Sequence, residues 1–189
     1  MKVVIMKTKI ICSTIAGLTL MGALFNGCSS GGTTDSTTAT TTLDGFFVDS
    51  AVEGLSYKSV LSGITDSNGR YSFQGVDRVE FLLGDKLSLG TLAPKTSTVS
   101  VLDFFDNTKT IDDPEIQNLL VLLQSLDSDG DVSNGITILP ETITILEGLL
   151  AAAPYNVTDL TTFDFSTMTL VDLNTLLTAV VAATPNPDD

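Results

Sequence analysis

Both cysteines of the chain, Cys12 and Cys28, lie within its first 28 residues, so everything after Cys28 is free of thiols. That part of the chain can form no disulfide, no thiolate metal site and no cysteine nucleophile. Its fold must therefore depend on a hydrophobic core, and Leu, Val, Ile and Phe are frequent enough to form one. Histidine is absent as well, which removes the most common general base and the usual transition-metal ligand.

The first 27 residues have the pattern of an export signal. Lys2, Lys7 and Lys9 precede an apolar run over residues 10–25 that is interrupted only by small or weakly polar residues. As a helix this run would rise about 24 Å, which is short of the roughly 30 Å hydrocarbon core of a bilayer. We therefore expect a cleaved signal peptide over residues 1–27 rather than a permanent membrane span.

The end of this segment, Leu24-Phe25-Asn26-Gly27-Cys28, resembles the lipobox of bacterial lipoproteins. The resemblance implies cleavage before Cys28, a diacylglyceryl thioether on its sulfur and a fatty acyl group, such as palmitate, on its amino group. Three acyl chains, at about 0.8 kcal/mol per buried methylene, would bind a membrane firmly. In this class of lipoprotein a Ser29 rather than an aspartate after the cysteine favours the outer membrane. The alternative is an ordinary signal peptide that is cleaved elsewhere.

The segment after the cysteine differs sharply from the rest of the chain. Residues 28–42 are rich in Ser, Gly and Thr and contain no large apolar side chain, so we expect a disordered tether. From Cys28 onward the chain carries 23 acidic side chains against six lysines and arginines, a formal charge of −17. Such a charge repels nucleic acid, which is therefore not an expected partner, and it is compatible with multivalent cations.

Short apolar runs broken by Gly, Asp and Asn predict a β-rich module over residues 43–93. The runs at 46–48, 55–57 and 71–73 are typical strands, and alternation over 79–89 around Gly84 and Asp85 predicts a second hairpin. About six short strands in total favour a small antiparallel sandwich. Four polar residues are expected to have structural roles at strand ends and turns: Asp49, Ser50, Asp66 and Asn68.

Residues 65–73, Thr-Asp-Ser-Asn-Gly-Arg-Tyr-Ser-Phe, contain a tight-turn sequence in which Gly69 can take a positive φ. This stretch resembles the T-D-x-x-G-x-[FY]-x-F pattern of carboxypeptidase-regulatory-like and other transthyretin-like β-sandwich modules. Such modules are commonly spacers, adhesive units or carbohydrate-associated folds of secreted and surface proteins. Residues 47–57 and 81–90 also resemble a group of uncharacterised bacterial envelope lipoproteins. The resemblance covers about fifty residues and implies a fold rather than an activity.

Residues 94–183 predict three to four helices packed on this module, with a disordered tail at 184–189. Residues 113–115, Asp-Pro-Glu, are typical of a helix start in which Asp113 is the cap. Apolar residues at helical spacing predict helices that end near Leu126, run from Pro140 or Glu141 to Ala153, and run from about Met168 to Ala183. The expected fold is thus α+β: a small antiparallel, transthyretin-like β-sandwich followed by a C-terminal helical region that shares its core.

The most informative polar motif is Asp127-Ser128-Asp129-Gly130-Asp131-Val132-Ser133-Asn134-Gly135. Carboxylates at alternate positions after an apolar helix begin an EF-hand loop. This loop is not an EF-hand, because Val132 stands where a glycine should turn and Ile138 stands where a bidentate glutamate should bind. Asp127, Asp129 and Asp131, with Asn134, could still hold Ca²⁺ in a shorter loop. The alternative is a solvated acidic turn.

No set of residues after Cys28 predicts catalysis. A nucleophilic triad needs a base, the chain has no histidine, and its four remaining lysines lie in no recognisable motif. Two-carboxylate glycosidase chemistry stays open, although no tryptophan is present to form a sugar platform. We therefore expect a lipid-anchored envelope protein that acts as a structural, adhesive or binding module toward an envelope protein or surface ligand. The alternatives are a calcium-dependent accessory subunit of an envelope complex and a carboxylate-based hydrolase.

Overall fold

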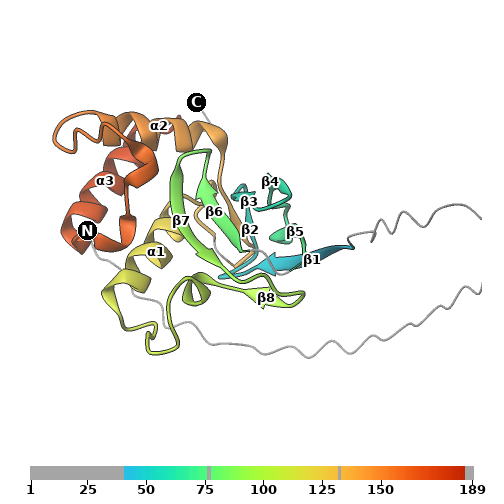
Figure 1. Ribbon diagram of the computed structural model, residues 1–189. Coiled ribbons are helices and arrows are strands. Elements are labelled where there is room, and N and C mark those ends of the chain that lie inside the picture. The colour runs from blue at the N-terminus through green and yellow to red at the C-terminus, as the bar shows by residue number, and fades with distance from the viewer. Residues whose placement is uncertain (1–40, 76–77, 132, 186–189) are drawn as a thin grey trace, which may run out of the picture. The chain divides into compact units, whose positions relative to one another are not determined.

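The computed structural model describes residues 41–75, 78–131 and 133–185, so the export segment, Cys28 and all but the end of the tether lie outside the described residues. This part of the chain is an α+β protein, as expected, with several sheets of two to four strands and three α-helices (Figure 1). In chain order the elements are β1 (Thr42–Phe47), β2 (Val52–Glu53), β3 (Ser56–Lys58), β4 (Ser62–Ile64), β5 (Arg70–Gln74), β6 (Val79–Leu83), β7 (Leu87–Leu92), β8 (Thr98–Val99), the 3₁₀ helix η1 (Val101–Phe104), α1 (Pro114–Ser125), β9 (Ile136–Thr137), α2 (Pro140–Ala151), the 3₁₀ helices η2 (Leu160–Thr162) and η3 (Phe165–Thr167), and α3 (Leu170–Ala183).

The strands form a four-stranded sheet, a three-stranded sheet and one isolated pair. The four-stranded sheet has the order β4-β3-β6-β7 and is antiparallel throughout, which confirms the hairpin expected at β6–β7. In the three-stranded sheet β1 pairs antiparallel with β5 and parallel with β8. The pair is β2 with β9, in parallel. Because β8 and β9 come from beyond residue 93, the mainly helical part of the chain completes two of these sheets.

The turn at residues 65–70 connects strands of different sheets, because β4 before it and β5 after it do not pair with each other. One carboxylate oxygen of Asp66 accepts the main-chain N–H groups of Asn68 and Arg70 at 2.9 and 3.0 Å, which confirms a structural role for Asp66. Gly69 has a φ of 71°, and a Cβ there would lie 2.2 Å from the carbonyl oxygen of Phe47. Glycine is required on both grounds.

The three α-helices begin and end within a few residues of the limits expected from the sequence, and both α1 and α2 carry proline in their first turn. Asp113 occupies the cap position of α1, but its carboxylate accepts the N–H of Thr110 at 2.7 Å instead of capping the helix. Thr169 does cap α3, where its hydroxyl accepts the N–H of Asp172 at 3.1 Å. None of the helices in the described ranges is long and apolar enough to cross a membrane.

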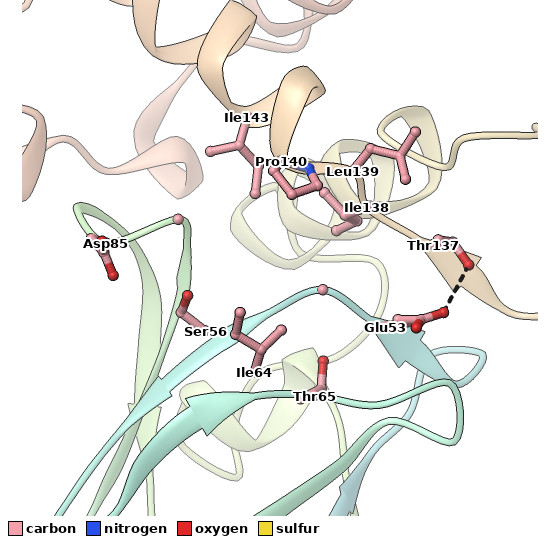
Figure 2. A pocket seen from close by; sticks show the side chains of 12 residues that line it. Glu53, Ser56, Ile64, Thr65, Asp85, Thr137, Ile138, Leu139, Pro140 and Ile143 are labelled. Carbon is pink, nitrogen blue, oxygen red and sulfur yellow. Dashed lines mark hydrogen bonds between the residues drawn. The ribbon is translucent and has the colours of Figure 1, made fainter. Parts of the chain in front are cut away.

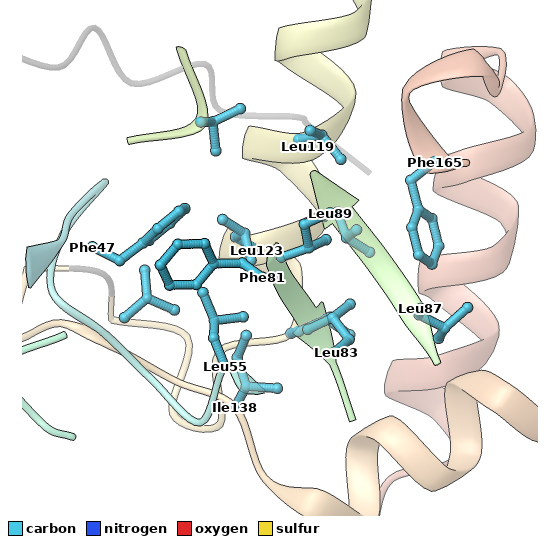
Figure 3. Packing of buried hydrophobic residues seen from close by; sticks show 14 of the residues in the cluster. Phe47, Leu55, Phe81, Leu83, Leu87, Leu89, Leu119, Leu123, Ile138 and Phe165 are labelled. Atoms are coloured by element: carbon cyan, nitrogen blue, oxygen red, sulfur yellow. The ribbon is translucent and has the colours of Figure 1, made fainter. Parts of the chain in front are cut away.

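The buried hydrophobic residues of strands and helices form one cluster (Figure 3). Phe47 of β1 and Phe81 of β6 have ring centroids 4.9 Å apart, and the same cluster includes Leu119 and Leu123 of α1 and Phe165 of η3. The amide of buried Asn118 donates to three main-chain carbonyls between residues 165 and 168, which fixes the segment before α3 against α1. The sheets and the helices therefore share a core.

Candidate functional site

A pocket of about 400 Å³ lies between the four-stranded sheet and the segment that leads from β9 into α2 (Figure 2). One side is formed by β2, β3, the end of β4 and the turn between β6 and β7, and the other by residues 137–143. Its position depends on the parallel pairing of β2 with β9, which holds Val52 opposite Ile136 and Glu53 opposite Thr137. Its volume is within the range of small-ligand or side-chain pockets.

Five apolar side chains line the pocket together with five polar ones, and water can reach several of the apolar side chains. Ile64, at the end of β4, is 67% exposed, and Leu139 is 40% exposed, whereas Ile138 and Ile143 behind them are buried. Leu139 occupies the cap position of α2, where a polar side chain would normally accept a helix N–H, and it makes no such bond. An apolar residue at this position breaks a local rule of helix structure, and such departures are expected at functional sites.

Two carboxylates lie at opposite ends of the pocket, Glu53 and Asp85 (Figure 2). The hydroxyl of Thr137 donates to Glu53 at 3.4 Å, and Lys58 donates to the main-chain carbonyl of Asp85 at 2.8 Å. Within the described ranges no lysine or arginine lies at ion-pairing distance from either carboxylate. The lining includes no basic side chain, so the pocket combines an apolar surface with negative charge.

Thr137 also connects the pocket to the acidic loop. Its main-chain N–H donates to Oδ1 of Asp127 at 2.9 Å, while Oδ2 of Asp127 is buried with no hydrogen-bond partner in the described structure. Burial raises the pKa of Asp127, and the negative charge of neighbouring Asp129 raises it further. Asp127 and Asp129 are therefore close together.

The other members of the predicted calcium site are turned toward local donors. The Asn134 amide donates to Asp129 at 2.8 Å and the main-chain N–H of Asp131 donates to it at 2.9 Å, which lowers the pKa of Asp129. Asp131 accepts both the N–H and the hydroxyl of Ser133, at 3.1 and 2.6 Å. Within the part of the chain that the structure describes, no three Asp, Glu, His or Cys side chains converge on a point suited to a metal ion. Calcium would therefore require Asp131 and Asn134 to turn.

A different carboxylate shows the largest effect of burial. Asp49 lies in the turn between β1 and β2, where burial raises its pKa to about 6 although a hydrogen bond from the side chain of Gln124 lowers it. Its Oδ2 is buried with no hydrogen-bond partner in the described structure. A carboxyl group with such a shift is a candidate acid or base. Asp49 does not line the pocket, however, so the shift has no reacting group to act on there.

A larger hollow of about 600 Å³ lies next to η1 and is lined by Arg78, Lys95 and Lys109. Two of these cations are already neutralised, because Lys95 forms an ion pair with Asp103 and Lys109 forms one with Glu115 at 2.9 Å. This hollow therefore does not present a concentrated positive charge to an anion.

Comparison with protein-family models, with curated proteins and with solved structures gave no match. Any function of the site must therefore be inferred from its geometry alone. Sequence reasoning identified Asp127, Asp129, Asp131 and Asn134 but missed the pocket next to them. The local sign of the pocket in the sequence was an apolar residue immediately before Pro140 at a helix start. The two sides of the pocket are brought together by the pairing of β2 with β9, which the sequence did not reveal.

Proposed function

We propose that this chain is a lipid-anchored protein of the cell envelope, placed in the outer membrane, whose folded part is a structural, adhesive or binding module without catalytic activity. The observation that carries the proposal is the lipobox-like sequence that ends at Cys28, followed at once by a Ser/Gly/Thr tether. Signal, acylated cysteine and tether are the successive parts that a secreted module needs if it is to stand away from a membrane.

The absence of catalysis is supported by the chemistry of the side chains. The chain has no histidine, and no cysteine follows Cys28. The two carboxylates of the pocket lie at its opposite ends, with apolar side chains between them (Figure 2). General acid–base chemistry on one substrate needs groups that converge on the reacting bond. A surface that is apolar and acidic suits recognition instead.

We also propose that the strands form a transthyretin-like sandwich. The support is local: residues 65–73 have the T-D-x-x-G-x-[FY]-x-F pattern, and the turn at 65–70 connects the four-stranded sheet to the three-stranded sheet. Two sheets joined in this way, with apolar residues from both in one cluster, are what a sandwich requires. The helices α1 to α3 would then cover one end of it.

A second candidate function is a calcium-dependent role in an envelope complex. The observation in its favour is the buried Oδ2 of Asp127, which has no hydrogen-bond partner among the described residues and lies beside a second carboxylate, Asp129. A cation would satisfy that oxygen and remove the repulsion between the two charges. Asp131 and Asn134 would complete the site after rotation away from Ser133 and Asp129.

Fractionation of the envelope tests the placement. Inner and outer membranes from cells that express the full chain are separated on a density gradient, and intact cells are treated with protease to show which face the module occupies. The wild-type protein and a Cys12→Ser control are expected in the outer membrane, and Cys28→Ser is expected to be absent from it. A Cys28→Ser protein that still sediments with the outer membrane would overturn the proposal.

A further inference from the structure

We propose that the pocket between β4 and α2 binds an extended peptide segment of a partner protein, one with a bulky aliphatic side chain flanked by lysine or arginine. The inference deepens the proposed function, because it names the class of partner that a binding module of this kind would hold.

Ile64 and Leu139 are large aliphatic side chains that are exposed to water. Each leaves a large aliphatic surface in water, and the two lie on facing sides of the pocket, backed by the buried Ile138 and Ile143 (Figure 2). An apolar side chain inserted between them would remove apolar surface on both sides from water, which favours binding. The polar residue that helix capping would prefer at position 139 is absent, although it would have stabilised α2.

The pocket also carries negative charge. Glu53 and Asp85 stand at the two ends of the apolar surface, and the pocket lining contains no basic side chain. A cationic group beside an inserted aliphatic side chain would meet Glu53 at one end and Asp85 at the other, where the ammonium of Lys58 already lies 2.8 Å from the main-chain carbonyl of Asp85, so the contact with Glu53 should contribute more. The formal charge of −17 from Cys28 onward also favours cationic partners at long range and disfavours acidic ones.

Ile64 also lies at the edge of its sheet. It belongs to β4, which is an edge strand of the order β4-β3-β6-β7. An edge strand presents main-chain donors and acceptors to a neighbouring chain, and extended peptides commonly bind in this way. The strand is short, so the main-chain contribution is small and the side chain in the pocket must supply most of the specificity.

The experiment uses the mature, lipidated protein in nanodiscs of phosphatidylcholine, with empty nanodiscs as the blank. Three labelled peptides of equal length are titrated by fluorescence anisotropy: Gly-Lys-Ser-Ile-Ser-Lys-Gly, in which both lysines share the isoleucine's face of an extended chain, the same peptide with glutamate for both lysines, and the same peptide with serine for isoleucine. The first is expected to bind at least roughly fivefold more tightly than either of the others, and its affinity should fall as salt is added.

Matched variants locate the binding. Ile64→Ser is compared with Val60→Ser, since these side chains are 67% and 64% exposed on the same hairpin but only Ile64 lines the pocket. Glu53→Gln is compared with Asp112→Asn, an exposed carboxylate outside the pocket. Ile64→Ser and Glu53→Gln are expected to weaken binding of the first peptide by roughly fivefold or more, and the two controls by less than about twofold.

Several results would overturn the inference: equal binding of the acidic peptide, equal loss in Ile64→Ser and Val60→Ser, or no binding of the first peptide up to millimolar concentration. The outcome does not depend on the anchor, because acylation of Cys28 is read separately by mass spectrometry of the same preparation.

Discussion

Replacing Asp49 by asparagine should stabilise the protein at neutral pH. Asp49 is held in the turn between β1 and β2, where its Oδ2 is buried and has no hydrogen-bond partner in the described structure. Asparagine has the same shape, can keep a hydrogen bond with Gln124, and carries no charge to be removed from water. The variant therefore separates the cost of the buried charge from the packing of the side chain.

The magnitude follows from the pKa of Asp49, which burial raises from 3.8 to about 6. A tenfold difference in proton affinity is worth about 1.4 kcal/mol, so the two values correspond to roughly 3 kcal/mol, and partial exposure to water reduces the expected effect to about 1–2 kcal/mol. Asp49 binds its proton more tightly in the folded state than in the unfolded state, so protonation of Asp49 favours folding. Its contribution to stability is complete below pH 3.8 and is lost as the pH rises through about 6.

The assay is urea unfolding of wild type and Asp49→Asn at intervals from pH 4 to pH 8. Asp49→Asn is expected to be more stable than wild type by about 1–2 kcal/mol at pH 7.5, with most of the difference gone at pH 4. Asp112→Asn, at an exposed position, controls for the loss of one negative charge. A difference that does not change with pH, or a variant less stable than wild type at pH 7.5, would refute the reasoning.

Three further predictions concern the core, a turn and the acidic loop. Leu123→Ala, which empties a fully buried site, should cost roughly 2–5 kcal/mol in a single unfolding transition, whereas two separate transitions would contradict the shared core. Gly69→Ala should lower the free energy of unfolding in urea by about 1–3 kcal/mol, because its Cβ would lie 2.2 Å from the carbonyl oxygen of Phe47. Gly75→Ala, where φ is also positive but space is open, should lower it by less. The calcium hypothesis predicts that millimolar calcium, measured against chelator, raises the Tm of wild type but not of Asp129→Ala. An equal change in both proteins would mean that the loop is only a solvated turn.

The local elements could be predicted from the sequence because their signals are local. Proline in the first turn, with apolar residues at helical spacing, marked α1 and α2. Alternation on both sides of Gly84 and Asp85 marked the β6–β7 hairpin. The turn around Gly69 was predicted as well, because its residues favour positive φ and hydrogen bonds within the loop.

The pairings between distant segments could not be predicted, and the pocket depends on them. β9 has two residues, Ile136 and Thr137, and no pattern of two residues specifies that it pairs in parallel with β2, far earlier in the chain. The prediction that Asp113 caps α1 was wrong for a local reason. The main-chain N–H of Thr110 competes for the Asp113 carboxylate and forms a hydrogen bond with it. In the acidic loop the sequence likewise showed where the carboxylates stand along the chain but not where their side chains point. Their orientation depends on local hydrogen-bond donors such as Ser133 and Asn134.

Metabolic labelling with palmitate tests the central claim most directly. Cells that express the full chain, Cys28→Ser or Cys12→Ser are grown with labelled palmitate, and the protein is recovered and analysed on gels. Wild type and Cys12→Ser are expected to carry the label and to migrate as the processed form, because acylation is proposed at Cys28. Cys28→Ser should carry none and should accumulate unprocessed. Undiminished label in Cys28→Ser, or none in wild type, would contradict the claim that this protein is anchored by lipid on Cys28.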